Sequence, residues 1–116
     1  DRGLDGPGVA ALAWSESRFT AHAKSAAGAV GVLQIIPKYW CSKKREDRCD
    51  VIESGLDAYE HYVSRSKKYL EGICRYNSGR SCKRSNITKR YAEAVESLMV
   101  EVKERIMFTS CSEDGC

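Results

Sequence analysis

The sequence predicts a single, mainly α-helical domain with a very small or absent β-sheet, stabilised by disulfide bonds. Apolar residues recur at the spacing of a helix face in four segments of the chain. Residues 30 to 36 are apolar and branched, and are compatible with either a short strand or a buried turn. Six cysteines occur among 116 residues, a length that fits one domain.

The first helix is expected to begin near Pro7, since proline suits the first helical position, and to close at Phe19. Residues 20 to 29 are small and polar and predict an irregular loop. Pro37 ends the apolar stretch that follows. The charged residues 38 to 49 then form a loop or a short helical turn.

Three further helices are expected. Asp50 is a good N-cap for a helix that runs to about residue 64. Another helix is expected over residues 66 to 76, stopping at Gly79, and the last over residues 88 to 107. The tail, 108–116, is expected to fray unless a disulfide bond ties it. The residues predicted to face inward are Ile52, Leu56, Tyr59 and Val63, then Leu70 and Ile73, then Tyr91, Val95, Leu98, Val102 and Ile106.

Composition limits the class of function. The net charge is only +3, with 30% charged and 42% hydrophobic residues. Such a balance is compatible with an anionic partner such as a cell wall, but it lacks the dense basic stripe of a nucleic-acid-binding protein. No apolar run approaches the length of a membrane span, so none is expected. The chain starts at Asp1 without a signal peptide, as a trimmed domain does. We expect a monomer.

The cysteines predict local disulfide bonds. We expect the pairs Cys41 with Cys49, Cys74 with Cys82, and Cys111 with Cys116, among the several pairings that six cysteines allow. Disulfides place the chain outside the cytoplasm; the alternative is six reduced thiols in a cytosolic protein. With two histidines and no CxxC pair, no metal site is expected.

Glu16 is the clearest candidate for a chemically reactive side chain. It falls on the same predicted helix face as Leu12 and Ala13, at the end of an apolar stripe. Burial raises the pKa of a carboxyl group, which can then donate a proton near neutral pH. The alternative is a glutamate at a helix end that reaches water or pairs with Arg18 or Lys24.

Separate motif blocks, in a fixed order along the chain, carry a resemblance to a family. The sequence reads E-S-x-F from Glu16, A-x-S-x-x-G-A-x-G-x-x-Q-I-x-P from Ala23 to Pro37, and Y-N-x-G from Tyr76. This pattern resembles that of the lytic transglycosylases with the goose-lysozyme-like fold, over about residues 7 to 100. The chain departs from the family at Leu33, where methionine is usual, and at Arg75, where a small residue is usual.

The resemblance implies a lysozyme-like α+β domain occupying residues 1 to 116, which needs no cofactor. Its partner is the glycan strand of peptidoglycan. Glu16 acts as acid and then base to cleave the β-1,4 bond between N-acetylmuramic acid and N-acetylglucosamine, giving a 1,6-anhydro end. No second carboxylate belongs to a motif, although one could fold back near the cleft; the candidates are Glu46, Asp47, Asp50 and Asp57.

The other motif residues take supporting roles by resemblance. Ser25 forms a hydrogen bond close to Glu16 or to the substrate; alternatively, its hydroxyl only stabilises the loop. Gln34 binds sugar polar groups, or is a buried amide paired with backbone. Tyr76 holds the glutamate or an acetamido group. Asn77 has a structural role, and Gly31 allows a left-handed backbone or a close approach of the glycan. Outside the motifs, Trp14 and Trp40 either stack on sugars or belong to the core.

Two other functions remain open at this point. One is a muramidase on the same fold, which hydrolyses the same bond with water. The other is a non-catalytic wall-binding or assembly module of a secretion system or phage particle. Whether cleavage is endo or exo does not follow from the sequence.

Overall fold

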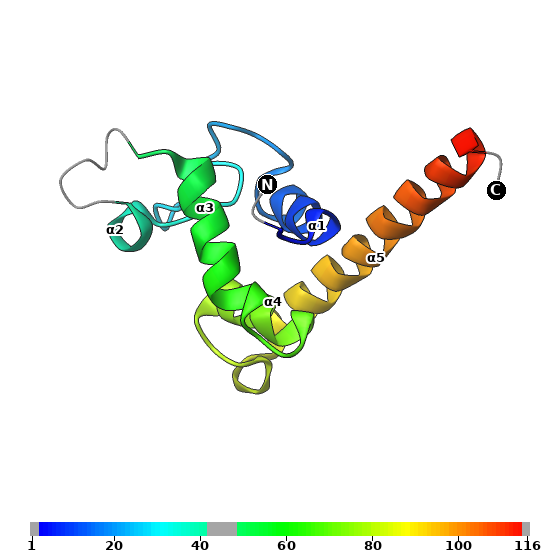
Figure 1. Ribbon diagram of the computed structural model, residues 1–116. Coiled ribbons are helices and arrows are strands. Elements are labelled where there is room, and N and C mark those ends of the chain that lie inside the picture. Colours follow the sequence, from blue (N-terminus) through cyan, green and yellow to red (C-terminus); the bar gives the residue numbers. More distant parts are fainter. Residues whose placement is uncertain (1–2, 42–48, 115–116) are drawn as a thin grey trace.

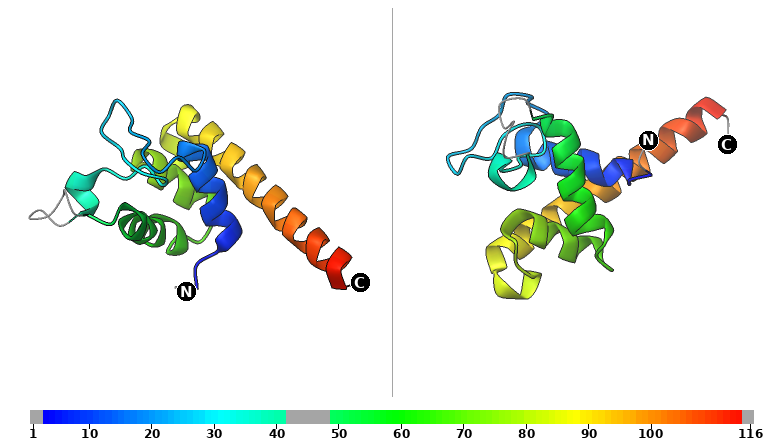
Figure 2. Two further views of the ribbon diagram at one scale, coloured as in Figure 1. Left: turned by 90° about the horizontal axis from the view of Figure 1, so that it is seen from above. Right: turned by 60° about the vertical axis from the view of Figure 1, so that its left-hand side comes forward.

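The computed structural model describes residues 3–41 and 49–114, with side chains up to residue 107. Its helices are α1 (Gly6–Ser17), α2 (Pro37–Trp40), α3 (Val51–Tyr59), α4 (Tyr69–Ser78) and α5 (Asn86–Asp114). Helix α5 packs against both α1 and α4, and its C-terminal half extends away from the body of the domain (Figure 1 and Figure 2). Over the described residues the fold is mainly helical, as predicted.

Helix α1 ends two residues before the predicted Phe19. Arg18 and Phe19 both adopt left-handed backbone angles, with φ of 55° and 61°, which take the chain out of the helix. The backbone N–H of Arg18 closes the last turn on the carbonyl of Trp14 at 2.9 Å. Glu16 therefore lies in the final turn of α1, where the chain turns into the long loop.

The segment from residue 30 to 36 is a turn and not a strand. Val30 forms isolated antiparallel bridges with Lys24 and Ile35, and the described residues contain no longer ladder. Gly31 has a φ of 83°, and a Cβ atom there would lie 2.9 Å from Cγ2 of Val51. Glycine is thus required for the backbone angle and for the approach of the loop to α3.

The start of α3 confirms the predicted N-cap. The carboxylate of Asp50 accepts hydrogen bonds from the backbone N–H groups of Ile52 and Glu53 at 3.1 Å. The helix continues as a π-helical turn, Glu60–Ser64, close to the predicted end. The prediction that Ile52 faces inward was wrong, because the buried face of α3 follows Gly55, Ala58 and Tyr59 and leaves Ile52 exposed.

Helix α4 begins at Tyr69 instead of residue 66, and it ends at Gly79 as predicted, with a left-handed φ of 74°. Helix α5 is longer than predicted, since the tail expected to fray is helical as far as Asp114. Ile106 was predicted to face inward but is exposed, because this part of α5 has left the body of the domain (Figure 1).

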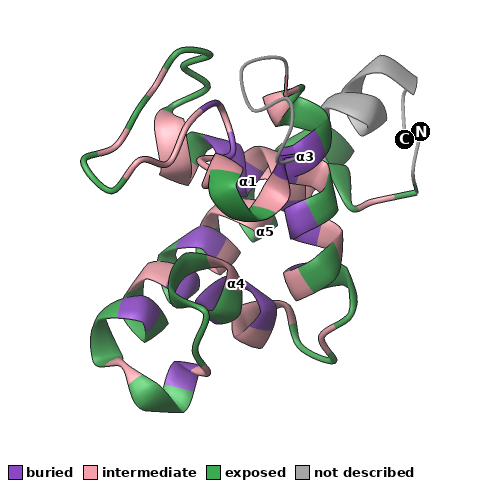
Figure 3. Cartoon of the chain, turned by 90° about the vertical axis from the view of Figure 1, so that its left-hand side faces the viewer, coloured by how far each residue is buried: buried purple, intermediate pink, exposed green. Residues whose placement is uncertain are grey.

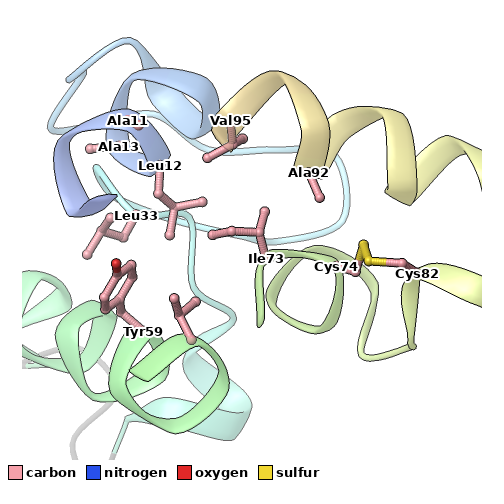
Figure 4. Packing of buried hydrophobic residues seen from close by; sticks show 11 residues of the cluster. Ala11, Leu12, Ala13, Leu33, Tyr59, Ile73, Cys74, Cys82, Ala92 and Val95 are labelled. Atoms are coloured by element: carbon pink, nitrogen blue, oxygen red, sulfur yellow. A yellow bond between two sulfur atoms is a disulfide. The ribbon is translucent and has the colours of Figure 1, made fainter. Parts of the chain in front are cut away.

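The core lies where α1, α4 and α5 meet the π-helical turn and the loop. Leu12, Ile73 and Val95, each from a different helix, are fully buried and converge there (Figure 4). Buried positions gather on the inner faces of the elements, whereas the outer faces are exposed (Figure 3). None of the helices in the described ranges is long and apolar enough to cross a membrane.

Two of the three predicted disulfides are confirmed. Cys41 is bonded to Cys49 and Cys74 to Cys82, with Cα–Cα distances of 5.6 Å and 5.3 Å. The predicted bond between Cys111 and Cys116 lies outside the residues whose side chains are described. The second bridge ties α4 to the short 3-10 turn before α5, next to the segment that carries the Y-N-x-G motif.

Candidate active site

A cleft of about 410 Å³ brings most of the predicted site residues together. Glu16, Ser25, Gln34, Tyr76 and Asn77 all line it, although they come from α1, the long loop and α4. Gly31 is not among the residues that line the cleft, and its role is to shape the loop behind it. The fold therefore joins motif blocks that lie sixty residues apart in the sequence.

Glu16 is partly buried and has no cationic partner among the described residues. Desolvation raises the pKa of its carboxyl group to about 7, and an interaction with the hydroxyl of Tyr91 opposes that rise. The alternative of a pair with Arg18 does not occur, because Arg18 lies over the ring of Trp14 at 4.7 Å. Near neutral pH, both protonation states of Glu16 are therefore populated.

Tyr91, from α5, is the neighbour of Glu16 that sequence reasoning missed as a site residue. Its hydroxyl is buried and makes no hydrogen bond of ordinary geometry within the described structure. It nevertheless interacts with the Glu16 carboxyl closely enough to act on its pKa, and burial with the negative charge of Glu16 raises the pKa of Tyr91 itself. The signals in the sequence were its place on the apolar face of the last helix and its resemblance, shared with Val95, to the helix that follows the motifs in the lytic transglycosylases.

Ser17 fixes the end of α1 against the loop. Its hydroxyl lies 3.1 Å from the carbonyl of Ala13 and 2.7 Å from the carbonyl of Val32, and can donate to either. The E-S pair of the first motif thus has a physical basis: Ser17 holds the helix end and the loop together while Glu16 faces the cleft.

Gln34 is held in a strained, left-handed conformation with a φ of 52°. Its side-chain amide donates to the carbonyl of Ala23 at 3.1 Å and to that of Gly31 at 2.8 Å. Both donors are thus used inside the loop, which leaves the side-chain oxygen as the group available to a ligand in the cleft.

Ser25 and Asn77 each have a structural bond. The hydroxyl of Ser25 accepts from the backbone N–H of Ala29 at 3.0 Å, which stabilises the loop and leaves its proton free. The side-chain oxygen of Asn77 accepts from the hydroxyl of Thr88 at 2.7 Å. Asn77 thereby links the end of α4 to the first turn of α5, in keeping with the structural role expected for it.

The hydroxyl of Tyr76 donates to the backbone carbonyl of Leu33 at 2.6 Å, and not to Glu16. Burial, together with the negative charge of Glu16, raises the pKa of Tyr76, so it remains a neutral donor. Tyr76 lines the cleft and holds the loop that carries Gln34 in place.

Aromatic rings form one wall of the cleft. Trp40 and Tyr62 meet edge to face at a centroid distance of 5.8 Å, and Tyr62 meets Tyr76 at 6.1 Å. Trp40 thus lines the site. Trp14 neither lines the cleft nor belongs to the core, the two places expected for it. Its side chain is 39% exposed and packs against Phe19.

Glu16 is the one acidic side chain among the described residues that line the cleft. Asp50 is used as the cap of α3, and Asp57 does not line the cleft. Glu46 and Asp47, the other two candidates for a second carboxylate, lie outside the described residues. No cluster of potential metal ligands occurs in the part of the chain that the structure describes.

The family model of the transglycosylase SLT domain matches residues 1–99. The chain belongs to this family. An SLT domain has a lysozyme-like fold and acts on peptidoglycan, which agrees with the helical architecture and the single-glutamate cleft. The SLT domain and the two disulfide bonds of its described residues together indicate a place outside the cytoplasm. No curated protein and no solved structure matches the chain.

Proposed function

We propose that this SLT domain is a lytic transglycosylase that works as a monomer on peptidoglycan glycan strands, with Glu16 as its single acid and base. The observation that carries the proposal is the state of Glu16: a partly buried, desolvated carboxyl group that lines the cleft, with a pKa raised to about 7. A group whose pKa lies near the working pH can both donate and accept a proton during one reaction.

In the first step, protonated Glu16 donates its proton to the oxygen of the β-1,4 bond between N-acetylmuramic acid and N-acetylglucosamine. The bond to the anomeric carbon breaks, and the N-acetylglucosamine end leaves as an alcohol. In the second step, the Glu16 carboxylate takes the proton of the muramoyl 6-hydroxyl. The oxygen of that hydroxyl then closes on the anomeric carbon, and Glu16 is again protonated.

The surroundings of Glu16 suit a sugar, which presents polar substituents around a ring with an apolar face. The aromatic wall of Trp40 and Tyr62 offers faces and edges for a sugar ring. The free side-chain oxygen of Gln34 can accept from a sugar hydroxyl or acetamido N–H, and the hydroxyl of Ser25 can donate. In this proposal both residues position the glycan beside Glu16.

The single carboxylate favours transglycosylation over hydrolysis. Ordinary retaining and inverting glycosidases, which use water, have a second carboxylate as nucleophile or base, commonly about 5 to 10 Å from the acid. In the proposed reaction the substrate's own hydroxyl replaces water, so one carboxylate is enough. The described lining of the cleft offers only Glu16.

The test is digestion of purified peptidoglycan followed by mass analysis of the released fragments. A transglycosylase yields fragments that end in 1,6-anhydromuramic acid, lighter by one water than fragments with a reducing end. Reducing ends alone would identify a muramidase. No release of fragments, with wall binding retained, would identify a non-catalytic module.

A further inference from the structure

A second pocket, of about 500 Å³, adjoins the cleft and is strongly basic. The described residues that line it are Arg75, Arg80, Ser81 and Arg84. Arg75 lines the catalytic cleft as well, so the two pockets share a wall. The basic pocket therefore lies at the end of α4, directly beyond the motif residues Tyr76 and Asn77.

The segment that carries these arginines is constrained. The bond between Cys74 and Cys82 closes it across eight positions. Ser81 caps the short turn that follows, since its hydroxyl accepts from the N–H of Lys83 at 3.2 Å and its carbonyl accepts from the N–H of Arg84 at 3.0 Å. The arginines are thus presented by a fixed loop, which reduces the loss of entropy on binding.

The positive charge of this pocket is only partly compensated. Arg75 pairs with Glu71 of the same helix at 3.3 Å, and this pair is partly exposed. Neither Arg80 nor Arg84 makes an ion pair among the described residues. Two guanidinium groups therefore remain available, and the planar fork of arginine matches the geometry of an oxyanion such as a carboxylate.

We propose that this basic pocket binds a carboxylate of the peptide that is attached to the muramoyl sugar of the substrate. The inference rests on the proposed function, because it requires the glycan strand to occupy the cleft. A stem peptide is covalently joined to the muramoyl residue, so a strand seated beside Glu16 carries its peptide carboxylates past the wall formed by Arg75. The pocket makes this enzyme selective for strands that carry charged stem peptides.

The experiment compares initial rates on two forms of one phosphate-free wall preparation: peptidoglycan with free stem carboxylates, and the same material after chemical amidation of those carboxylates. Amidation keeps the bulk of the peptide and removes its charge. The enzymes are the wild type, the double variant Arg80→Ser/Arg84→Ser, and the control Arg90→Ser, which changes an exposed arginine of α5 that lines neither pocket.

The wild type and Arg90→Ser should prefer the unmodified strands by about fivefold in kcat/KM at low salt, and the double variant should cleave both forms at the same rate. Equal rates for the wild type on both forms, or an unchanged preference in the double variant, overturn the inference. If the preference appears only with wall material that retains its phosphodiesters, the pocket binds phosphate and the assignment of a carboxylate ligand is overturned.

If the wild type cleaves neither form, the proposed function fails, and binding then decides the inference separately. Calorimetric titration with soluble, uncleaved muropeptides should give a Kd about fivefold lower for the free-carboxylate form than for the amidated form. Equal Kd values contradict the basic pocket as a carboxylate site.

Discussion

The hydroxyl of Tyr76 donates a hydrogen bond of 2.6 Å to the backbone carbonyl of Leu33, and so joins α4 to the loop beside Glu16. These two residues belong to different motif blocks and are 43 positions apart. The bond holds the turn that presents Gln34 to the cleft. It gives a physical reason why a tyrosine of the Y-N-x-G motif can matter for the reaction that we propose for Glu16.

We expect Tyr76→Phe to lower both stability and turnover. The variant leaves the Leu33 carbonyl without its partner, which should reduce the free energy of unfolding by about 1 to 2 kcal/mol. Because the loop carrying Gln34 is then less well placed, kcat should fall more than KM rises. Urea unfolding and steady-state kinetics on peptidoglycan measure the two effects, and turnover equal to that of the wild type would remove Tyr76 from the site.

We expect Glu16→Gln to abolish wall clearing while glycan binding survives, since glutamine has nearly the same shape but cannot transfer the proton. Turbidity of a wall suspension measures clearing, and co-sedimentation with insoluble peptidoglycan measures binding. Glu93→Gln, an exposed position on α5, is the matched control and should clear the wall normally. Clearing by Glu16→Gln at the wild-type rate would refute the assignment of the acid.

The raised pKa of Glu16 also predicts how stability depends on pH. Its carboxyl has a pKa of about 7 when folded, against an ordinary value of 4.5, so the folded state holds the proton more tightly. Stability should therefore decrease as the pH rises from about 4.5 to 7, and the loss at higher pH should reach at most about 3 kcal/mol. Glu16→Gln should relieve this penalty.

Urea unfolding of the wild type and Glu16→Gln at pH 4 and pH 8 measures this contribution. The variant should be the more stable protein at pH 8, and the difference between the two should be smaller at pH 4. The same difference at both pH values would show that the carboxyl is not desolvated in the folded state.

Removal of the Tyr91 hydroxyl should shift the pH profile of the reaction. The interaction with Tyr91 lowers the pKa of Glu16, so Tyr91→Phe should raise it. Because the first step needs protonated Glu16, activity should fall as the pH rises through about 7, and the variant should show this fall at higher pH. A profile of kcat/KM against pH that does not move would contradict the contact.

The bond between Cys74 and Cys82 should stabilise the domain and the site together. Replacing both residues by alanine should reduce the free energy of unfolding by about 2.6 kcal/mol, the value expected for a closed loop of this length. It should also weaken activity, because α4 carries Tyr76. Intact mass before and after reduction counts the bridges, and will show whether Cys111 and Cys116 form a third.

Much of the fold was predictable because local chemistry determines it. Asp50 caps α3 through two N–H groups of its own first turn, and Gly79 ends α4 through its own backbone angle. The two confirmed disulfides join cysteines eight positions apart. In each case the partners are close neighbours in the sequence, so the pattern of residues is enough.

The predictions that were wrong concern which face of a helix is buried and where a helix ends. Periodicity gave an inward position to Ile52 and Ile106, but both are exposed. A helical spacing indicates which residues share a face, and only the packing of other elements decides where that face is covered. The C-terminal half of α5 extends away from the body of the domain (Figure 1), and Ile106 and Met107 are exposed there.

The sequence by itself placed Glu16 near the end of a helix, and its resemblance to the lytic transglycosylases grouped Ser25, Gln34 and Tyr76 with it. The tertiary structure decided what raises the pKa of the Glu16 carboxyl group. Its pKa depends on burial and on Tyr91, which α5 brings from 75 positions away. The same packing placed the Arg80 and Arg84 pocket against the wall of the cleft. Desolvation and charge proximity are properties of assembled surfaces, which no single stretch of the chain contains.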